Sequence, residues 1–114
     1  MECPKCSAKM EEVNFQNVEI DRCEGCRGLW FDTGEAESLS RTWVTEWLDI
    51  GDPEIGEKFD HADKVLCPRC NVAMENHFDL EKSQVCYEVC PTHGKFFDAG
   101  EFTIWLDNRY LKSN

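Results

Sequence analysis

Cysteine pairs recur along this chain, and their spacing constrains its fold more than any other feature. Cys-Pro-Lys-Cys at residues 3–6 reappears as Cys-Pro-Arg-Cys at residues 67–70, displaced by 64 positions. Residues 18–23 then match 85–90 at a displacement of 67, and residues 28–35 match 94–101 at a displacement of 66. An internal repeat determines how a chain is organised, so we predict two copies of one small unit.

Each unit has the pattern of a β-hairpin followed by a short third strand. In the first unit, apolar and polar residues alternate on both sides of a turn at Gln16–Asn17, and residues 29–31 form the expected third strand. In the second unit the corresponding strands are expected around Phe78 and Leu80, over 85–89 and over 95–97, with the hairpin turn at 81–83.

Each unit continues into Asp-x-Gly-Glu, which predicts the start of a helix. Asp32 and Asp98 can accept hydrogen bonds from first-turn amides, and Glu35 and Glu101 stand at the third position of a capping box. An amphipathic helix is expected after each motif. Its apolar side would carry Ala36, Leu39, Trp43, Val44, Trp47 and Leu48 in the first unit, and Phe102, Trp105, Leu106, Arg109 and Tyr110 in the second.

Eight cysteines in 114 residues are several times the average content and need a chemical reason. The chain opens on Met1, Glu2 and Cys3 with no secretory leader, and no apolar run approaches the length of a membrane span. We therefore expect a cytoplasmic protein with reduced thiols, in which paired cysteines bind metal rather than form disulfides.

The first unit has the ligand spacing of a zinc ribbon. Cys3 and Cys6 are followed by sixteen residues and then by Cys23 and Cys26, so two Cys-x-x-Cys turns can complete one tetrahedron. A thioredoxin-like redox pair normally follows a strand and opens a helix, which Cys3 does not. Iron in a four-cysteine site has the same ligand set, so the spacing alone leaves it open.

The second unit offers two choices for its fourth ligand. Counting cysteines selects Cys86, but the repeat alignment places Cys90 at the position of Cys23 and His93 at the position of Cys26. Imidazole nitrogen readily replaces a thiolate on zinc. We predict that Cys86 is a spare strand residue. His61 and His77 stand away from ligand spacing and are expected to be ordinary polar residues.

These assignments predict a small metal-stabilised α+β fold of two tandem zinc ribbons, each followed by an amphipathic helix. The first ribbon and helix are expected over 1–50, an acidic connector over 51–64, and the second ribbon and helix over 65–114. Two Zn²⁺ ions per chain are expected. Their predicted ligands are Cys3, Cys6, Cys23 and Cys26 in one site and Cys67, Cys70, Cys90 and His93 in the other.

The motif resembles the transcription factor IIB-type zinc-ribbon family of small, mainly prokaryotic proteins. In the first unit the matching residues are Cys3, Cys6, Met10, Cys23, Cys26, Gly28, Trp30, Asp32, Gly34 and Glu35. In the second unit they are Cys67, Cys70, Met74, Cys90, Gly94, Asp98, Gly100 and Glu101. The second unit departs from the motif at His93 and Phe96. The resemblance implies a zinc-binding ribbon fold and says little about biological role.

The charge of the chain bears on its partners. A formal net charge of −11 opposes phosphate binding, because affinity for nucleic acid comes mainly from Lys and Arg. We expect a protein–protein interaction module with a protein partner, compatible with a homodimer through the aromatic helices. The alternative is a transcription-associated factor contacting RNA polymerase or nucleic acid, for which Lys5, Lys9, Arg22, Arg27 and Arg41 would supply a basic patch. Catalytic zinc needs an open coordination position, so no enzyme activity is expected.

Overall fold

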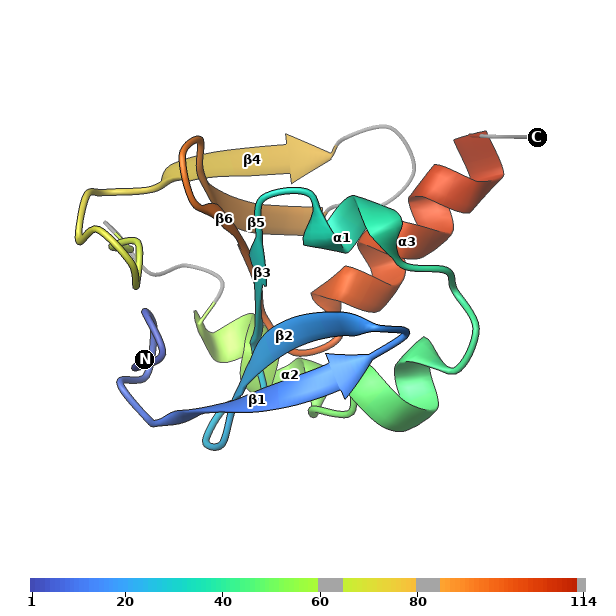
Figure 1. The fold of residues 1–114 in the computed structure, drawn as a ribbon, viewed down its shortest axis with the longest axis horizontal. Helices are drawn as coiled ribbons and strands as arrows, with labels where there is room; N and C mark the ends of the chain where they lie inside the picture. Colours follow the sequence, from blue (N-terminus) through green and yellow to red (C-terminus); the bar gives the residue numbers. More distant parts are fainter. Residues whose placement is uncertain (60–64, 80–84, 113–114) are drawn as a thin grey trace.

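The computed structural model describes residues 1–59, 65–79 and 85–112 and contains one six-stranded antiparallel sheet. The strand order is β1-β2-β3-β6-β5-β4, so each unit contributes three neighbouring strands (Figure 1). The strands are β1 (Met10–Phe15), β2 (Val18–Cys23), β3 (Leu29–Asp32), β4 (Glu75–Asp79), β5 (Val85–Cys90) and β6 (Gly94–Phe97). The hairpins and third strands predicted for both units are therefore present. The turn expected at 81–83 lies outside the described residues, as does Leu80.

The two units meet along β3 and β6, where Trp30 pairs with Phe96. These two residues occupy equivalent positions in the repeat, and the register continues as Leu29 with Phe97 and Phe31 with Lys95. Equivalent residues face each other at the centre of an isologous interface, as in a two-fold symmetric dimer. The repeat therefore folds as an internal pseudo-dimer, joined by main-chain hydrogen bonds between its third strands.

Alternation along β3 and β6 creates an apolar core on each face of the sheet. Leu29, Phe31 and Phe97 belong to the core on the face covered by helices, whereas Trp30 and Phe96 belong to the core on the other face. The second core also contains residues from the cysteine pairs, namely Cys3, Cys23, Cys26, Cys67 and Cys90. The helical segments within 36–48 and 102–106 and the cysteine clusters are consequently held on opposite faces of one sheet.

The second predicted helix is present as α3 (Glu101–Lys112). Phe102, Trp105 and Leu106 are buried on the face that was expected to be apolar, and Arg109 lies over the Trp105 ring. The predicted role of the Tyr110 side chain lies outside what the structure describes. In the part of the chain that the structure covers, every helix is too short or too polar to cross a lipid bilayer.

The continuous first helix predicted over 36–48 is wrong. The structure has a short α1 (Glu35–Ser38), an extended residue at Leu39 and a separate π-helix over Val44–Leu48. The Gln16 side chain explains the break, because it donates to the carbonyls of Ser40 and Thr42 and accepts from the Ser40 amide. Those backbone groups are no longer available for helical hydrogen bonds.

The segment predicted as an acidic connector contains a helix, α2 (Pro53–Phe59). Gly56 packs so closely on the second unit that a Cβ there would lie 2.5 Å from the Ala99 carbonyl oxygen. Just before the connector, the Asp49 carboxylate accepts hydrogen bonds from the amides of Gly100 and Thr103 at the start of α3. Asp49 and Gly56 thus hold the described part of this segment against the second unit. The division into domains stays a prediction.

Candidate metal centres

The first cluster gathers four sulfur atoms from two turns at one end of the β1–β2 hairpin. Cys3 and Cys6 precede β1, Cys23 ends β2, and Cys26 lies in the turn before β3. Antiparallel pairing of β1 and β2 sets Met10 opposite Cys23, which brings the two turns together. The four Sγ atoms lie within 4.8 Å of one another.

The geometry of the first cluster suits a tetrahedral zinc ion. The Sγ atoms of Cys3 and Cys26 are 3.7 Å apart, and those of Cys6 and Cys23 are 3.3 Å apart. A zinc–sulfur bond of about 2.3 Å implies about 3.8 Å between sulfurs at tetrahedral angles. The amides of Gly25 and Cys26 point at Cys23 Sγ at 3.3 Å, an arrangement that stabilises a thiolate.

The second cluster is built on the same plan from Cys67, Cys70, Cys90 and His93. Cys70 Sγ lies 3.9 Å from Cys90 Sγ, which in turn lies 3.5 Å from His93 Nδ1. One zinc–sulfur bond and one zinc–nitrogen bond at a tetrahedral angle imply about 3.5 Å for the latter pair. Nδ1 is therefore the nitrogen that the fold directs at the sulfurs, a detail that the sequence did not specify.

The structure places Cys86 and His77 outside both clusters. Cys86 lies in β5 opposite Phe78 and belongs to neither group of metal-binding geometry. His77 lies in β4, where its ring approaches Tyr87 and its Nε2 is 3.6 Å from Glu75. His61 lies outside the described residues. That the eight clustered side chains bind metal remains a prediction, and their ligand atoms have the proximity that it requires.

The pKa values of the thiols show why the first cluster calls for a cation. The hydrogen bond from Cys3 lowers the pKa of Cys26 to about 5, while the same contact raises the pKa of Cys3 far above its ordinary value. Burial raises the pKa of Cys23 to about 11. One thiolate is thus stabilised by its neighbours, whereas four thiolates together need a bound dication that takes the place of their protons.

The second cluster holds its protons less tightly. Burial opposes ionisation of Cys90, but hydrogen bonds from His93 and from the amides of Thr92 and His93 outweigh it and lower the pKa of Cys90 to about 7. Burial raises the pKa of Cys67. Three thiolates and one imidazole carry less negative charge than four thiolates, so a divalent ion leaves a net charge nearer zero at this site.

Lys5 links the first cluster to the second unit. It stands between Cys3 and Cys6, yet its ammonium lies 2.7 Å from Glu88 and 2.5 Å from Asp98. The side chain of Lys5 is 0% exposed and those of the two acids are 1% exposed. Burial alone would lower the pKa of Lys5, but the carboxylates of Asp98 and Glu88 raise it above its ordinary value.

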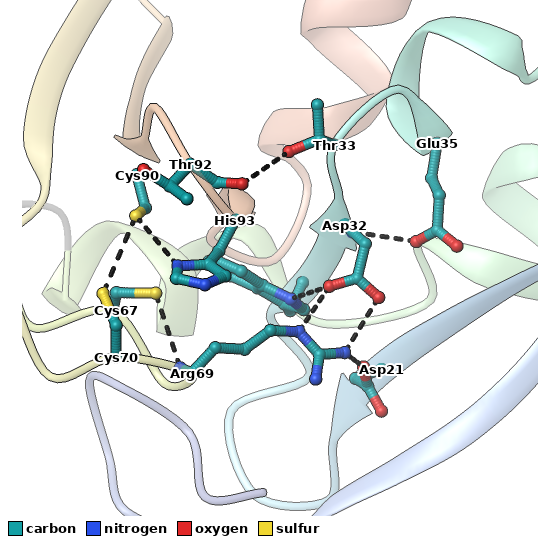
Figure 2. A network of polar contacts seen from close by, with 11 residues as sticks. Asp21, Asp32, Thr33, Glu35, Cys67, Arg69, Cys70, Cys90, Thr92 and His93 are labelled. Atoms are coloured by element: carbon teal, nitrogen blue, oxygen red, sulfur yellow. Dashed lines mark hydrogen bonds and ion pairs between the residues drawn. The ribbon is translucent and has the colours of Figure 1, made fainter.

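Arg69 makes the reciprocal contact from the second cluster to the first unit (Figure 2). Its Nε is 2.5 Å and its Nη2 is 2.8 Å from the two carboxylate oxygens of Asp32, and Nη2 is 3.8 Å from Asp21. In the repeat, Arg69 is equivalent to Lys5, Asp32 to Asp98, and Asp21 to Glu88. The same pair therefore forms twice across the pseudo-two-fold axis.

The capping role predicted for Asp32 is wrong, and that of Asp98 stays a prediction. The Asp32 carboxylate accepts from Arg69 and from Trp30 Nε1, and α1 has no side-chain hydrogen bond at its N-cap. The Asp98 carboxylate binds Lys5, and Asp49 supplies the carboxylate at the start of α3. The Glu35 half of the capping box is confirmed, since its carboxylate accepts from the Asp32 amide at 2.8 Å.

Sequence reasoning missed these inter-unit ion pairs, although the repeat contained the signal. A basic residue at the third position of Cys-Pro-x-Cys and acids at two downstream positions recur with the same charge in both copies. Charges at equivalent positions of a repeat indicate a shared structural role when the copies are related by a two-fold axis. The sequence did not reveal that axis, because the pairing of β3 with β6 joins segments 66 residues apart.

The comparisons agree with the first unit as the structure describes it. Residues 2–42 match the model of a zinc-ribbon family described as transcription factor zinc-finger, so the resemblance read from this unit is confirmed. The second cluster, spanning 67–93, is compatible with a second copy of the same ribbon. No curated protein and no solved structure matches the chain.

Proposed function

We propose that this chain is a non-enzymatic protein in which two structural zinc ions hold a rigid scaffold that binds a protein partner. The observation that carries the proposal is the pair of four-donor clusters, each with ligand atoms within 4.8 Å of one another. Four protein ligands fill a tetrahedral zinc site and leave no position for a water or substrate. Zinc in such a site contributes folding energy rather than Lewis-acid chemistry.

The metal proposal is tested on the purified full-length chain. Zinc content measured by elemental analysis should be two ions per chain in the wild type and in Cys86→Ser, and His93→Ala should weaken or lose one. Replacement by cobalt then reports the ligands, because visible absorption bands differ between a four-sulfur site and a three-sulfur, one-nitrogen site. Loss of metal in Cys86→Ser would overturn the assignment, and iron in the freshly purified protein would overturn zinc.

A protein partner fits the surface charge better than a nucleic acid does. The formal net charge is −11, and four of the five basic residues expected to form a patch make ion pairs within the chain, whereas Lys9 is exposed. Lys5 is buried against two acids, Arg22 and Arg27 contact Glu11, and Arg41 contacts Asp107. Few cationic groups of the first unit are therefore available for phosphate contacts, on which nucleic-acid affinity depends.

A second candidate function is a factor that contacts the transcription machinery. The match of residues 2–42 to a transcription factor zinc-finger family favours it. On the charge argument above, contact with RNA polymerase is more consistent with this chain than contact with DNA.

Affinity capture from the native host, followed by mass spectrometry, tests the interaction role. The expected result is a protein that co-purifies with the zinc-loaded chain and is lost after chelation. A gel shift at low salt distinguishes the alternatives, because salt-sensitive binding of DNA or RNA would overturn the preference for a protein. Recovery of RNA polymerase subunits would select the second candidate.

A further inference from the structure

Two tryptophans after α1 are exposed to an unusual degree. Trp43 is 62% exposed and Trp47 is 66% exposed. They stand four residues apart, and the Trp47 amide donates to the Trp43 carbonyl at 3.0 Å, which places them on neighbouring turns. Tryptophan is buried in most folds, and it is enriched among residues that dominate binding energy at protein interfaces. Their exposure therefore needs a reason.

The backbone at this surface is strained and rigidly held. Trp43 has φ 65° and ψ 11°, a left-handed conformation that asparagine or glycine adopts at lower cost. The next residues form a π-helix, a rare element that occurs frequently at functional sites. Val44 and Leu48 are fully buried beneath it, so the strain is maintained by packing.

Two side chains from the β1–β2 hairpin fasten the same segment from the other side. Gln16 bonds the carbonyls of Ser40 and Thr42, and Arg22 Nη1 donates to the carbonyls of Trp47 and Leu48 at 3.1 and 3.2 Å. The backbone that carries the two indoles is therefore already ordered in the unbound protein. Preorganisation of this kind lowers the entropy lost on binding.

The charge around the indoles indicates the chemistry of the partner. Residues 42–57 contain no Lys or Arg, and their acids Glu46, Asp52 and Glu54 are exposed, whereas Asp49 is buried against the start of α3. Nearby Arg22 and Arg41 are engaged with Glu11 and Asp107. A second copy of this chain would bring the same acidic segment and a further −11 charge to a symmetric contact, which like-charge repulsion disfavours.

From exposure, backbone and charge together, we infer that Trp43 and Trp47 form the docking surface for a protein partner with an apolar groove edged by Lys and Arg. This inference rests on the proposed interaction function and names the surface and the kind of partner. The indoles fill the groove, and the exposed acids Glu46, Asp52 and Glu54 face its basic rim. The zinc ribbons hold this surface in place through the β1–β2 hairpin.

A defined probe tests the surface first. The probe is a labelled 16-residue amphipathic peptide of leucine and lysine, and fluorescence anisotropy measures its binding to the zinc-loaded chain. A peptide of the same pattern with glutamate in place of lysine is the control probe. The Leu–Lys peptide should bind, with an affinity that falls as the salt concentration rises, and the Leu–Glu peptide should not bind. Equal binding of the two peptides would overturn the charge argument.

The variant Trp43→Asn with Trp47→Gln removes both indoles while keeping a residue suited to the left-handed backbone at position 43. Affinity for the Leu–Lys peptide should fall at least tenfold. The matched control is Val72→Ala with Ile104→Ala, which removes exposed apolar side chains elsewhere and should change affinity less than twofold. If the double tryptophan variant loses zinc, Trp47→Gln alone is tested instead. Its affinity for the Leu–Lys peptide should fall at least threefold. Unchanged affinity would overturn the inference.

Affinity capture from the host distinguishes an error in the inferred docking surface from an error in the proposed interaction function. The expected partner binds the wild type and the Val72/Ile104 control, is lost with the tryptophan variant, and carries a basic surface. Equal capture by all three chains would leave the interaction function standing and overturn the surface. Capture of no protein by the wild type would overturn both. A wild-type dimer in sedimentation equilibrium that the tryptophan variant abolishes would replace the basic partner by a second copy.

Discussion

The buried ion pairs of Lys5 allow a quantitative prediction with an internal control. Lys5→Met replaces the buried ammonium by an apolar group of similar length and leaves Glu88 and Asp98 in a space where both side chains are 1% exposed. Removing one partner of a buried ion pair costs about 3–5 kcal/mol, because an uncompensated charge remains. For a chain of this size each kcal/mol lowers the Tm by roughly 4 °C, so the expected shift is roughly 12–20 °C.

Arg69→Met is the matched control, because it removes the equivalent residue of the second unit. Its side chain is 38% exposed and that of Asp32 is 39% exposed, so solvent can hydrate the acid that is left behind. Exposed pairs contribute about 0–1 kcal/mol, which predicts a shift of no more than about 4 °C. Lys5 and Arg69 occupy equivalent positions between predicted metal ligands and differ in burial. The difference between the two Tm shifts therefore measures the effect of burial.

The assay is thermal and guanidinium unfolding of the zinc-loaded chain, followed by circular dichroism at one fixed concentration of free zinc. Zinc content must stay at two per chain, since Lys5 lies between two predicted ligands. The triple variant, Lys5→Met with Glu88→Gln and Asp98→Asn, should have a free energy of unfolding at least about 2 kcal/mol above that of Lys5→Met alone, because no unpaired charge remains. Equal shifts for Lys5→Met and Arg69→Met, or no recovery in the triple variant, would refute the reasoning.

The remaining predictions concern metal, ligand identity and a close backbone contact. Chelation of zinc should abolish the β-sheet signal in circular dichroism and make the chain protease-sensitive, and a fold that survives chelation would contradict a structural role. His93→Cys should retain two zinc ions and shift the cobalt spectrum of the second site towards four-sulfur ligation; an unchanged spectrum would exclude His93 as a ligand. Gly94→Ala should destabilise by at least about 2 kcal/mol in guanidinium unfolding, because its Cβ would lie 2.0 Å from the Phe31 carbonyl oxygen at φ +151°. Gly34→Ala, with open space around the added methyl, should cost about 1 kcal/mol from its φ of +88° alone, and equal costs at both positions would contradict the steric argument.

Local patterns were sufficient to predict the strands and the clustered side chains. Alternation predicts both hairpins, and the repeat register alone favours His93 over Cys86, as the clustered ligand atoms have it. These features depend on residues close in sequence or on equivalence between two copies. Zinc ribbons suit such reasoning, because the spacing of their cysteine pairs directly reflects the size of the turns around one ion.

The helix prediction failed where tertiary contacts override helical periodicity. Trp43 and Trp47 follow the apolar spacing of an amphipathic helix, but Gln16 bonds the backbone at Ser40 and Thr42 and interrupts it. Nothing in the local pattern of residues 36–48 signals a side chain twenty-four residues earlier. The same failure hid the exposed indoles, since periodicity assigned them to a core that Val44 and Leu48 already fill.

The pseudo-two-fold axis links the two candidate metal centres to the stability of the whole sheet. The basic residue inside each Cys-Pro-x-Cys turn, Lys5 or Arg69, forms an ion pair with an acid of the other unit. A metal ion that orders one turn therefore also orders an ion pair across β3 and β6. The arrangement is symmetric in topology and asymmetric in burial, because the Lys5 contacts are enclosed and the Arg69 contacts are open to solvent. Loss of metal from the first centre should therefore weaken the second more than the reverse. The coupling arises because the repeat folds as a pair of facing subunits within one chain.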